Sequence, residues 1–193
     1  MITQIKGKLV EKSPTNVVID CNGVGYLLHI SLQTYSLLPA DENVLLYTHL
    51  SIRDDAHTLY GFFTKVEREI FRLLTSVSGV GPSIARTMLS SMTSEEIQQA
   101  IASENVKAIQ SVKGIGIKTA QRVIVDLKDK IVKLFDLDEV SITQNNTNKE
   151  EALSALEVLG FLRKQADRVI GNILKETPDA SVETLIKKAL KNL

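Results

Sequence analysis

The chain has 193 residues, of which 44% are hydrophobic and 24% charged, a composition typical of a globular protein with one large domain or two to three small ones. Its 23 basic and 23 acidic residues give a formal net charge of zero, which disfavours binding of nucleic acid through bulk positive charge. Cys21, the only cysteine, excludes an internal disulfide framework, and no apolar run approaches the roughly 20 residues that cross a bilayer, so we expect a cytoplasmic protein with no membrane contact.

Residues 1–63 carry the signals of β-strands. After an alternating start, the runs that predict strands are 17–19, 26–30, 44–52 and 59–63. Gly23 and Gly25 suit a tight turn between two of these strands, and residues 53–57 suit another. Five short strands in so short a segment predict a small closed barrel, for which the OB type is the commonest candidate.

Most of the aromatic residues lie in this first segment. Clustered aromatics on an OB barrel are typical of surfaces that stack single-stranded bases, so a single-strand DNA-binding OB protein is one alternative function. Basic residues are fewer than acidic ones in residues 1–63, which favours the interpretation that the aromatic side chains fill the core.

Residues 64–140 have helical periodicity, and Thr93 to Glu96 reads as a capping box that opens one helix. The decisive feature is an internal repeat 35 residues apart, in which residues 79–85 and 114–120 share the pattern Gly-aliphatic-Gly-x-x-x-Ala. Each copy follows a short helical stretch and precedes a longer one. The duplication predicts two helix–hairpin–helix elements.

The residue types of this motif suit contact with a phosphate backbone. Glycines permit positive φ angles and close approach of another backbone, and the aliphatic residue between them, Val80 or Ile115, packs the hairpin onto its helices. The helix that follows begins with unpaired N–H groups at the positive end of its dipole. Lys118 and Arg122 lie four residues apart, a helical spacing that allows both to face the same phosphate track. We therefore expect sequence-independent binding of duplex DNA.

Other interpretations of these glycines fail on spacing. Ile84 and Thr119 occupy the positions where a dinucleotide-binding fingerprint needs a third glycine, and Ile117 stands where a P-loop needs glycine before its lysine. The three histidines have no cysteine or carboxylate at ligand spacing. We therefore expect no cofactor, no metal and no catalysis. A DNA-docking subunit of a nuclease is the second alternative.

The last part of the chain begins with a polar, non-periodic segment, residues 141–148, which we interpret as a flexible linker. Residues 149–193 then predict a three-helix (UBA-like) domain, barely long enough for an independent core. Its apolar residues around Gly160 fill that core or leave a surface for a partner.

The chain resembles the RuvA family over its whole length. The motifs that carry the resemblance are Arg53-Asp54-Asp55-Ala56, Leu59-Tyr60-Gly61-Phe62, the two hairpins, the linker and Ala155-Leu156-x-x-Leu159-Gly160-Phe161. The resemblance implies an α+β multi-domain protein with an OB-type barrel at 1–63, a tandem helix–hairpin–helix domain at 64–140 and a third domain at 149–193. It also implies a homotetramer, or an octamer, that holds an open four-way (Holliday) junction in recombination and repair. The implied partners are RuvB, a hexameric ATP-driven motor, and RuvC, a junction nuclease.

The resemblance also implies roles for particular residues. Asp54 and Asp55, which by themselves suggest a solvated turn, would form an acidic pin, and four copies would gather eight carboxylates where the junction strands part. The residues expected to bind DNA are Gly79, Val80, Gly81, Ser83, Arg86, Lys113, Gly114, Ile115, Gly116, Lys118 and Arg122. Those expected to contact the motor are Leu156, Leu159, Gly160 and Phe161.

The hairpins depart from the family pattern at three positions. Ser83 and Ile117 stand where relatives often carry lysine, and Lys113 stands where proline is usual. We therefore expect Lys118 and Arg122 to be the main side-chain contacts, with Arg86 as a candidate substitute at the first hairpin.

Overall fold

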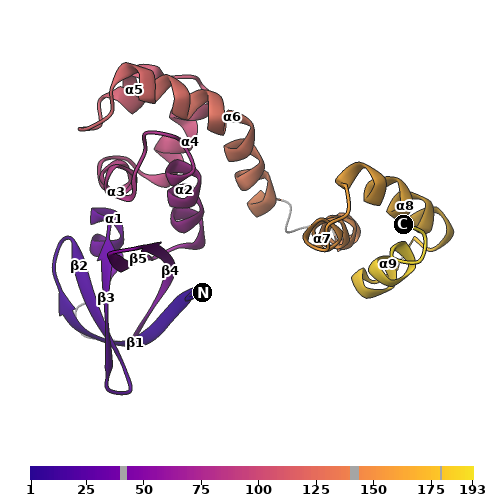
Figure 1. The fold of residues 1–193 in the computed structure, drawn as a ribbon, viewed down its shortest axis with the longest axis horizontal. Helices are drawn as coiled ribbons and strands as arrows, with labels where there is room; N and C mark the ends of the chain where they lie inside the picture. Colours follow the sequence, from indigo (N-terminus) through magenta and orange to yellow (C-terminus); the bar gives the residue numbers. More distant parts are fainter. Residues whose placement is uncertain (40–42, 140–143, 179) are drawn as a thin grey trace. The chain divides into compact units, whose positions relative to one another are not determined.

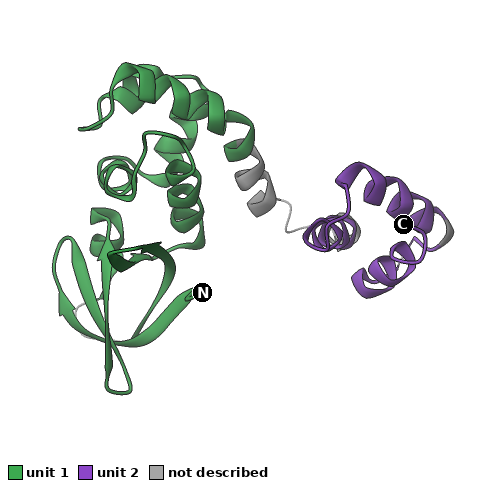
Figure 2. Cartoon of the chain, viewed as in Figure 1, with its two compact units in different colours: residues 1–134 green, residues 135–193 purple. Residues whose placement is uncertain are grey.

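The computed structural model of the chain describes residues 1–39, 43–139, 144–178 and 180–193. These residues form two compact units, Met1–Leu134 and Phe135–Leu193 (Figures 1 and 2). The first unit combines the strands with the helices of the hairpin region, and the second is entirely helical. Within the part of the chain that the structure describes, no helix combines the length and apolarity that crossing a bilayer requires.

Five strands close into a barrel in the order β1-β2-β3-β5-β4, which confirms the expected OB-type fold. The strands are β1 (Gln4–Lys12), β2 (Asn16–Cys21), β3 (Val24–Ile30), β4 (Asn43–Arg53) and β5 (Ala56–Phe62). Only β3 and β5 pair in parallel, and the other pairs are antiparallel. The inward side chains of alternating positions make the core, which consists of Ile5, Leu9, Val17, Ile19, Leu28, Ile30, Leu38, Val44 and Leu46.

The β2–β3 hairpin turns on two residues, Asn22 and Gly23, with φ angles of 55° and 91°. Two positive φ angles in a row define the turn whose twist matches that of paired strands, and asparagine followed by glycine is the sequence that adopts it most readily. Gly25, which the sequence also suggested for the turn, lies in β3 opposite Asp20. Gly25 is therefore a strand residue and takes no part in the change of direction.

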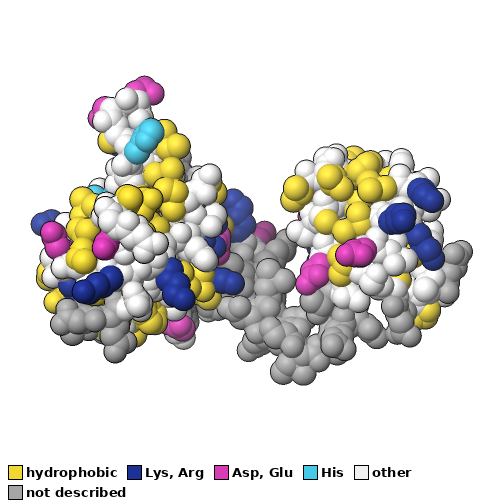
Figure 3. All heavy atoms as spheres, turned by 90° about the horizontal axis from the view of Figure 1, so that it is seen from below, with side chains coloured by type: hydrophobic (Ala, Val, Ile, Leu, Met, Phe, Trp, Pro, Cys, Tyr) yellow, Lys and Arg dark blue, Asp and Glu magenta, His cyan; other side chains and the backbone are white. Residues whose placement is uncertain are grey.

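The β4–β5 hairpin carries the expected acidic turn. Arg53 pairs with Ala56, so that Asp54 and Asp55 alone form the loop, and all residues from Ile52 to His57 are exposed. Figure 3 shows a narrow projection tipped by acidic side chains with a histidine beside them, which matches the composition of this hairpin. The turn is therefore tighter than the five residues expected, and its carboxylates stand out into solvent.

The helices of the first unit are α1 (Leu32–Leu37), α2 (Lys65–Thr75), α3 (Pro82–Ser91), α4 (Ser94–Ala102), α5 (Val106–Gln110) and α6 (Ile117–Glu139). Figure 1 shows α2 to α6 gathered at the end of the barrel that carries α1. The capping box at Thr93 and Glu96 is present, with both of its hydrogen bonds. The helical character expected of the second segment is confirmed.

Phe71 of α2 makes the apolar contact between the barrel and these helices. Its ring centroid lies 5.4 Å from that of His49, 5.0 Å from that of Tyr60 and 4.9 Å from that of Phe62. Such tilted and edge-on pairs add to the free energy of burial. Tyr60 and Phe62 pack against α2 and agree with the interpretation that the barrel aromatics fill the core, whereas Phe63 is 38% exposed and departs from it.

Glu67 of α2 makes the polar contact at the same boundary. Its buried carboxylate accepts hydrogen bonds from the Ser31 hydroxyl, from the Thr34 hydroxyl at 2.7 Å and from the Phe63 backbone N–H at 3.3 Å. Burial raises the pKa of Glu67, while these three donors oppose the rise. One side chain thus ties together the end of β3, helix α1 and the start of α2.

The second unit consists of α7 (Gln144–Val158), α8 (Arg163–Glu176) and α9 (Val182–Ala189), which confirms the three helices expected. Arg163 pairs with Glu150 at 2.7 Å and with Glu157 at 2.9 Å and so joins the start of α8 to α7. Residues 141–143 of the expected linker lie outside the described residues. Residues 144–148 are already helical, so the linker predicted from the sequence was too long.

Replacement of Glu67 should weaken the first unit. Glu67→Ala leaves the Ser31 and Thr34 hydroxyls without their acceptor at a buried site, while the Phe63 N–H keeps the Thr34 hydroxyl oxygen at 3.0 Å, and we expect the change to lower the free energy of unfolding by about 3 kcal/mol. Glu67→Gln keeps one acceptor oxygen and should cost about 1 kcal/mol. All four tyrosines belong to the first unit and the chain has no tryptophan, so tyrosine fluorescence during urea unfolding reports on this unit alone.

The same side chain should make stability depend on pH. Because the pKa of Glu67 is raised in the folded state above its ordinary value of 4.5, its favourable contribution is complete below that value and is lost as pH rises through the folded pKa. The advantage of the native chain over Glu67→Gln should therefore shrink as pH rises from 4.5. A difference that does not change with pH would contradict this account of the buried carboxyl.

Candidate nucleic-acid interface

The two hairpins repeat each other hydrogen bond by hydrogen bond. In the first hairpin, the backbone N–H of Val80 donates to the Val77 carbonyl at 3.0 Å. In the second, the backbone N–H of Ile115 donates to the Val112 carbonyl at 3.1 Å. The amide that closes the first turn of the following helix belongs to Ala85 in one copy and to Ala120 in the other, with distances of 3.0 and 2.9 Å. The sequence repeat is therefore a repeat of structure.

The first glycine of each hairpin has the backbone conformation that favours glycine. Gly79 has a φ angle of 93° and Gly114 one of 95°. A Cβ atom built on Gly79 would lie 3.7 Å from the Thr119 hydroxyl of the second hairpin, and one built on Gly114 would lie 3.9 Å from Ile84 of the first. Thr119 and Ile84 are themselves equivalent positions, so the two hairpins touch each other through reciprocal contacts.

The second glycine of each hairpin faces open space. A Cβ atom on Gly81 or Gly116 would meet no atom of the chain within 4 Å. Gly81 is the N-cap of α3 and makes no side-chain capping bond, whereas Thr64 and Thr93 accept a backbone N–H at the starts of α2 and α4. The first N–H groups of α3 and α6 are therefore uncapped by side chains of Gly81 and Gly116, and no side chain at these two positions shields them from an anion.

The side chains around the second hairpin include the expected cations. Lys113 and Lys118 are exposed, and Lys118 lies in the first turn of α6. Arg122 is exposed one turn further on, and its Nη1 atom donates to the carbonyl of Ser78 at 3.4 Å. Arg122 thus reaches the loop of the first hairpin, so this one cation of the second copy lies beside both hairpins. Ser83, at the first hairpin, is exposed and uncharged.

Arg86 is not part of this group. Its Nη1 atom lies 3.4 Å from the carbonyl oxygen of Thr15 and 3.3 Å from Nδ1 of His29, both in the barrel. The sequence suggested Arg86 as a substitute phosphate contact at the first hairpin. The structure places its guanidinium against the barrel because it lies on the face of α3 that packs there.

The residues expected to contact a motor separate into core and surface. Leu156 is fully buried in the core of the second unit and Phe161 is partly buried against it, so Leu156 cannot meet a partner. Gly160 has a φ angle of 95° and ends α7. Gly160 is exposed as well, and Leu159, which is 58% exposed, is the large apolar side chain of the set that reaches the surface.

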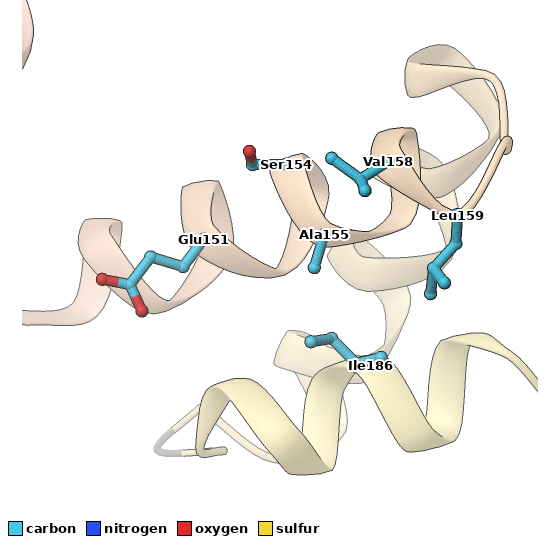
Figure 4. Close-up of a pocket in the computed structure, with 6 residues that line it drawn as sticks. All are labelled: Glu151, Ser154, Ala155, Val158, Leu159 and Ile186. Atoms are coloured by element: carbon cyan, nitrogen blue, oxygen red, sulfur yellow. The ribbon is translucent and has the colours of Figure 1, made fainter. Parts of the chain in front are cut away.

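Leu159 borders an apolar groove between α7 and α9. The groove is lined by Glu151, Ser154, Ala155, Val158, Leu159 and Ile186. Figure 4 shows Ala155 of α7 facing Ile186 of α9, with Leu159 at one end. Val158 is 86% exposed and was not singled out from the sequence. Helical spacing from Glu151 through Ser154 to Val158 is the signal that points to it once the register of α7 is known.

Metal ligands do not gather in the described part of the chain. Over residues 1–39, 43–139, 144–178 and 180–193, no three His, Cys, Asp or Glu side chains come together as a metal site requires.

Comparison with known proteins relates each part of the chain to a described family. The model of the RuvA N terminal domain matches residues 1–61, that of a SAM-like helix-hairpin-helix tandem matches 71–129, and that of the RuvA C-terminal domain matches 147–193. The Holliday junction branch migration complex subunit RuvA of Flavobacterium psychrophilum is 65% identical over 193 residues, 100% of both chains. Its counterpart from Christiangramia forsetii is 63% identical, again over 100% of both chains, and that from Bacteroides thetaiotaomicron is 48% identical over 100% of both.

The open glycine gives a direct test of the interface. Gly116→Val fills space that is empty in the protein, so it should cost no more than about 1 kcal/mol of stability as a poorer N-cap, yet lower the affinity for duplex DNA at least about tenfold. Gly114→Val should lower both, because its φ angle of 95° strains any side chain. Affinity is measured by gel shift and stability by tyrosine fluorescence.

Gly171→Ala in α8 is the matched control, since this glycine also has open space around it but lies in the second unit. It should leave DNA affinity unchanged. Unchanged duplex affinity in a folded Gly116→Val protein would rule out a close contact between DNA and the backbone at Gly116.

Proposed function

Because the chain belongs to the RuvA family, we propose that it is a non-catalytic subunit of a branch migration complex, which binds Holliday junctions and recruits an ATP-driven motor. The observation that carries this proposal is the pair of uncapped, glycine-bounded helix N-termini at Gly81 and Gly116. The names of the full-length relatives, which are Holliday junction branch migration complex subunits, indicate the four-way junction as the kind of DNA.

In the proposed mode of binding, the two hairpins hold the phosphate backbone of a duplex arm. The amides at the starts of α3 and α6 donate to phosphate oxygens, and the missing side chain at each second glycine lets the backbone come close. Lys113, Lys118 and Arg122 add positive charge beside them. None of these groups contacts a base edge, so the contact is independent of the DNA sequence. Branch migration requires such a contact, because the junction moves through changing sequences.

Asp54 and Asp55 supply the complementary repulsion. In a tetramer with four-fold symmetry, four β4–β5 hairpins bring eight carboxylates to the centre, where the strands of a junction separate. Phosphates within the roughly 8 Å screening length are repelled and directed into the arms. Attraction at the hairpins combined with repulsion at the centre selects the shape of a junction over a linear duplex, and this supports junction binding by a chain of zero net charge.

The tetramer is supported by apolar side chains on the outside of the barrel. Val10, Val24 and Leu27 are each at least half exposed, and Leu27 lies opposite Val18 in the β2–β3 ladder. Isolated apolar residues are ordinary on a surface, but several on one small barrel provide contact area for another copy.

The groove of the second unit is the proposed contact for the motor, RuvB, while RuvC acts on the same junction. Val158 and Leu159 expose apolar side chains at this groove, and Leu156 is buried in the core of the same unit. A docking domain raises the effective concentration of the motor at the junction without adding a DNA contact. The ATPase then belongs to that partner.

The acidic tip should control selectivity. Asp54→Asn and Asp55→Asn together keep the turn but remove its charge, so affinity for linear duplex should rise and the ratio of junction to duplex affinity should fall several-fold. Glu11→Gln, which removes an exposed carboxylate from β1, is the control and should leave the ratio unchanged. The measurement is competitive gel shift with four-way and linear DNA, and an unchanged ratio would leave the pair as a solvated turn.

The groove should serve the motor and not the DNA. Leu159→Glu introduces charge at an exposed position, so junction binding should persist while ATP-driven branch migration by RuvB falls about tenfold or more. A chain ending at residue 142 should behave in the same way. Leu190→Glu, at an exposed leucine of the same unit outside the groove, should have little effect. Loss of junction binding in the truncated chain would show that this unit touches DNA.

A further inference from the structure

The first hairpin is fastened to the barrel through Arg86. This arginine lies one turn into α3, and its Nη1 atom approaches the Thr15 carbonyl at 3.4 Å and His29 Nδ1 at 3.3 Å. Thr15 precedes β2 and His29 lies in β3, so a single guanidinium spans from the hairpin to two segments of the barrel.

The face of α3 that includes Arg86 makes a second polar link to the barrel. Ser90, four residues further on, accepts a hydrogen bond from the backbone N–H of Leu32 at 3.1 Å. Its hydroxyl donates in turn to the Arg86 carbonyl at 2.8 Å. Helix α1, which starts at Leu32, is the same helix that Glu67 holds through Ser31 and Thr34. Arg86 and Ser90 therefore form one face that holds α3 in place.

The second hairpin lacks this attachment, which makes the first one informative. In the repeat of 35 residues, Gln121 is the position equivalent to Arg86, and Val125 is the position equivalent to Ser90. Both are exposed, and Val125 is 80% exposed. The long cationic side chain therefore occurs in the copy that lies against the barrel, where it has partners.

His29 is suited to accept the arginine's hydrogen bond only when it is uncharged. A guanidinium has no lone pair to offer and stays protonated, so Nδ1 of His29 must carry the lone pair. Burial and the neighbouring Arg86 lower the pKa of His29, which keeps the ring neutral under ordinary conditions. Its other neighbours are Tyr60 of β5, a titratable phenol with its ring centroid 5.8 Å away, and the uncharged Asn16 across the β2–β3 ladder.

We propose that Arg86 is a positioning residue for junction recognition, which fixes α3 and its hairpin to the barrel that carries the Asp54-Asp55 tip. This inference rests on the proposed function. A junction is selected when phosphates lie at the hairpins and are kept from the tip, so the separation of the two must be constant. A linear duplex needs the hairpins alone, and its binding does not depend on that separation.

The salt dependence of binding separates positioning from direct contact. Arg86→Gln should lower the ratio of junction to duplex affinity about three- to tenfold, the net effect of removing one ordinary hydrogen bond, with duplex affinity and its salt slope unchanged. Lys118→Gln is the contrasting variant, which should reduce affinity for both DNAs and lower the salt slope by about one for each phosphate that Lys118 neutralises. Tyrosine fluorescence confirms that each variant is folded at the assay temperature.

The pH profile of the same ratio tests the role of His29. As pH falls below the ordinary histidine value of 6.5, protonation of His29 should break its contact with Arg86, so the junction preference of the native chain should decline. His29→Gln keeps an acceptor oxygen but cannot titrate, and its preference should stay level between about pH 7.5 and 5.5. His49 and His57 are common to both proteins, so the difference between the two profiles belongs to His29.

Three results would overturn the proposal. A smaller salt slope with weaker duplex binding in Arg86→Gln would make Arg86 a phosphate contact. An unchanged ratio in that variant would remove its positioning role, and equal pH profiles for the native chain and His29→Gln would remove the contact with histidine. A native chain without any junction preference would instead refute the proposed function, which the same assay measures first.

Discussion

The geometry of the first unit depends on a carboxylate buried where the barrel meets the helices. Glu67 is placed among donors from α1 and from the residue that follows β5, and Phe71, one turn later on α2, packs against three rings of the barrel. A buried carboxylate is costly without such partners, so the hydrogen bonds define one arrangement of α1 and α2 instead of merely allowing it. The two helix–hairpin–helix elements lie on the helical side of this boundary, and the β4–β5 hairpin lies on the barrel side.

Zero net charge and affinity for a polyanion are compatible when attraction and repulsion are separated in space. In the proposed mode of binding, attraction comes from the backbone amides that follow Gly81 and Gly116 and from a few cations around the second hairpin. The repulsive charge lies on a two-residue loop at the end of a long hairpin. A basic excess over the whole surface would bind any DNA, whereas this distribution of charge makes the shape of the ligand matter.

Local patterns in the sequence predicted the barrel, the two hairpins and the three-helix unit, because alternation, glycine spacing and helical periodicity are properties of neighbouring residues. Long-range contacts could not be predicted in this way. The partner of Arg86 is 57 positions distant in the chain, so its orientation toward His29 is a consequence of tertiary packing. Likewise, Leu156 is buried and Leu159 is exposed because of how the second unit packs. Asn148 lies in α7, and its side chain reaches the Ala180 carbonyl at 3.4 Å, a contact 32 positions distant in the chain.

The reciprocal contacts of Gly79 with Thr119 and of Gly114 with Ile84 have a consequence for movement along DNA. These contacts are those of an approximate two-fold relation, in which each hairpin takes the place of the other. The two strands of a duplex are also related by two-fold symmetry, because they run antiparallel. In the proposed mode of binding, the backbones of the two hairpins would therefore meet the two strands alike, and the polarity of a strand would not distinguish them, although the cations belong to the second copy. A backbone contact of that kind carries no direction of its own, so in this proposal the direction of travel would come from the motor.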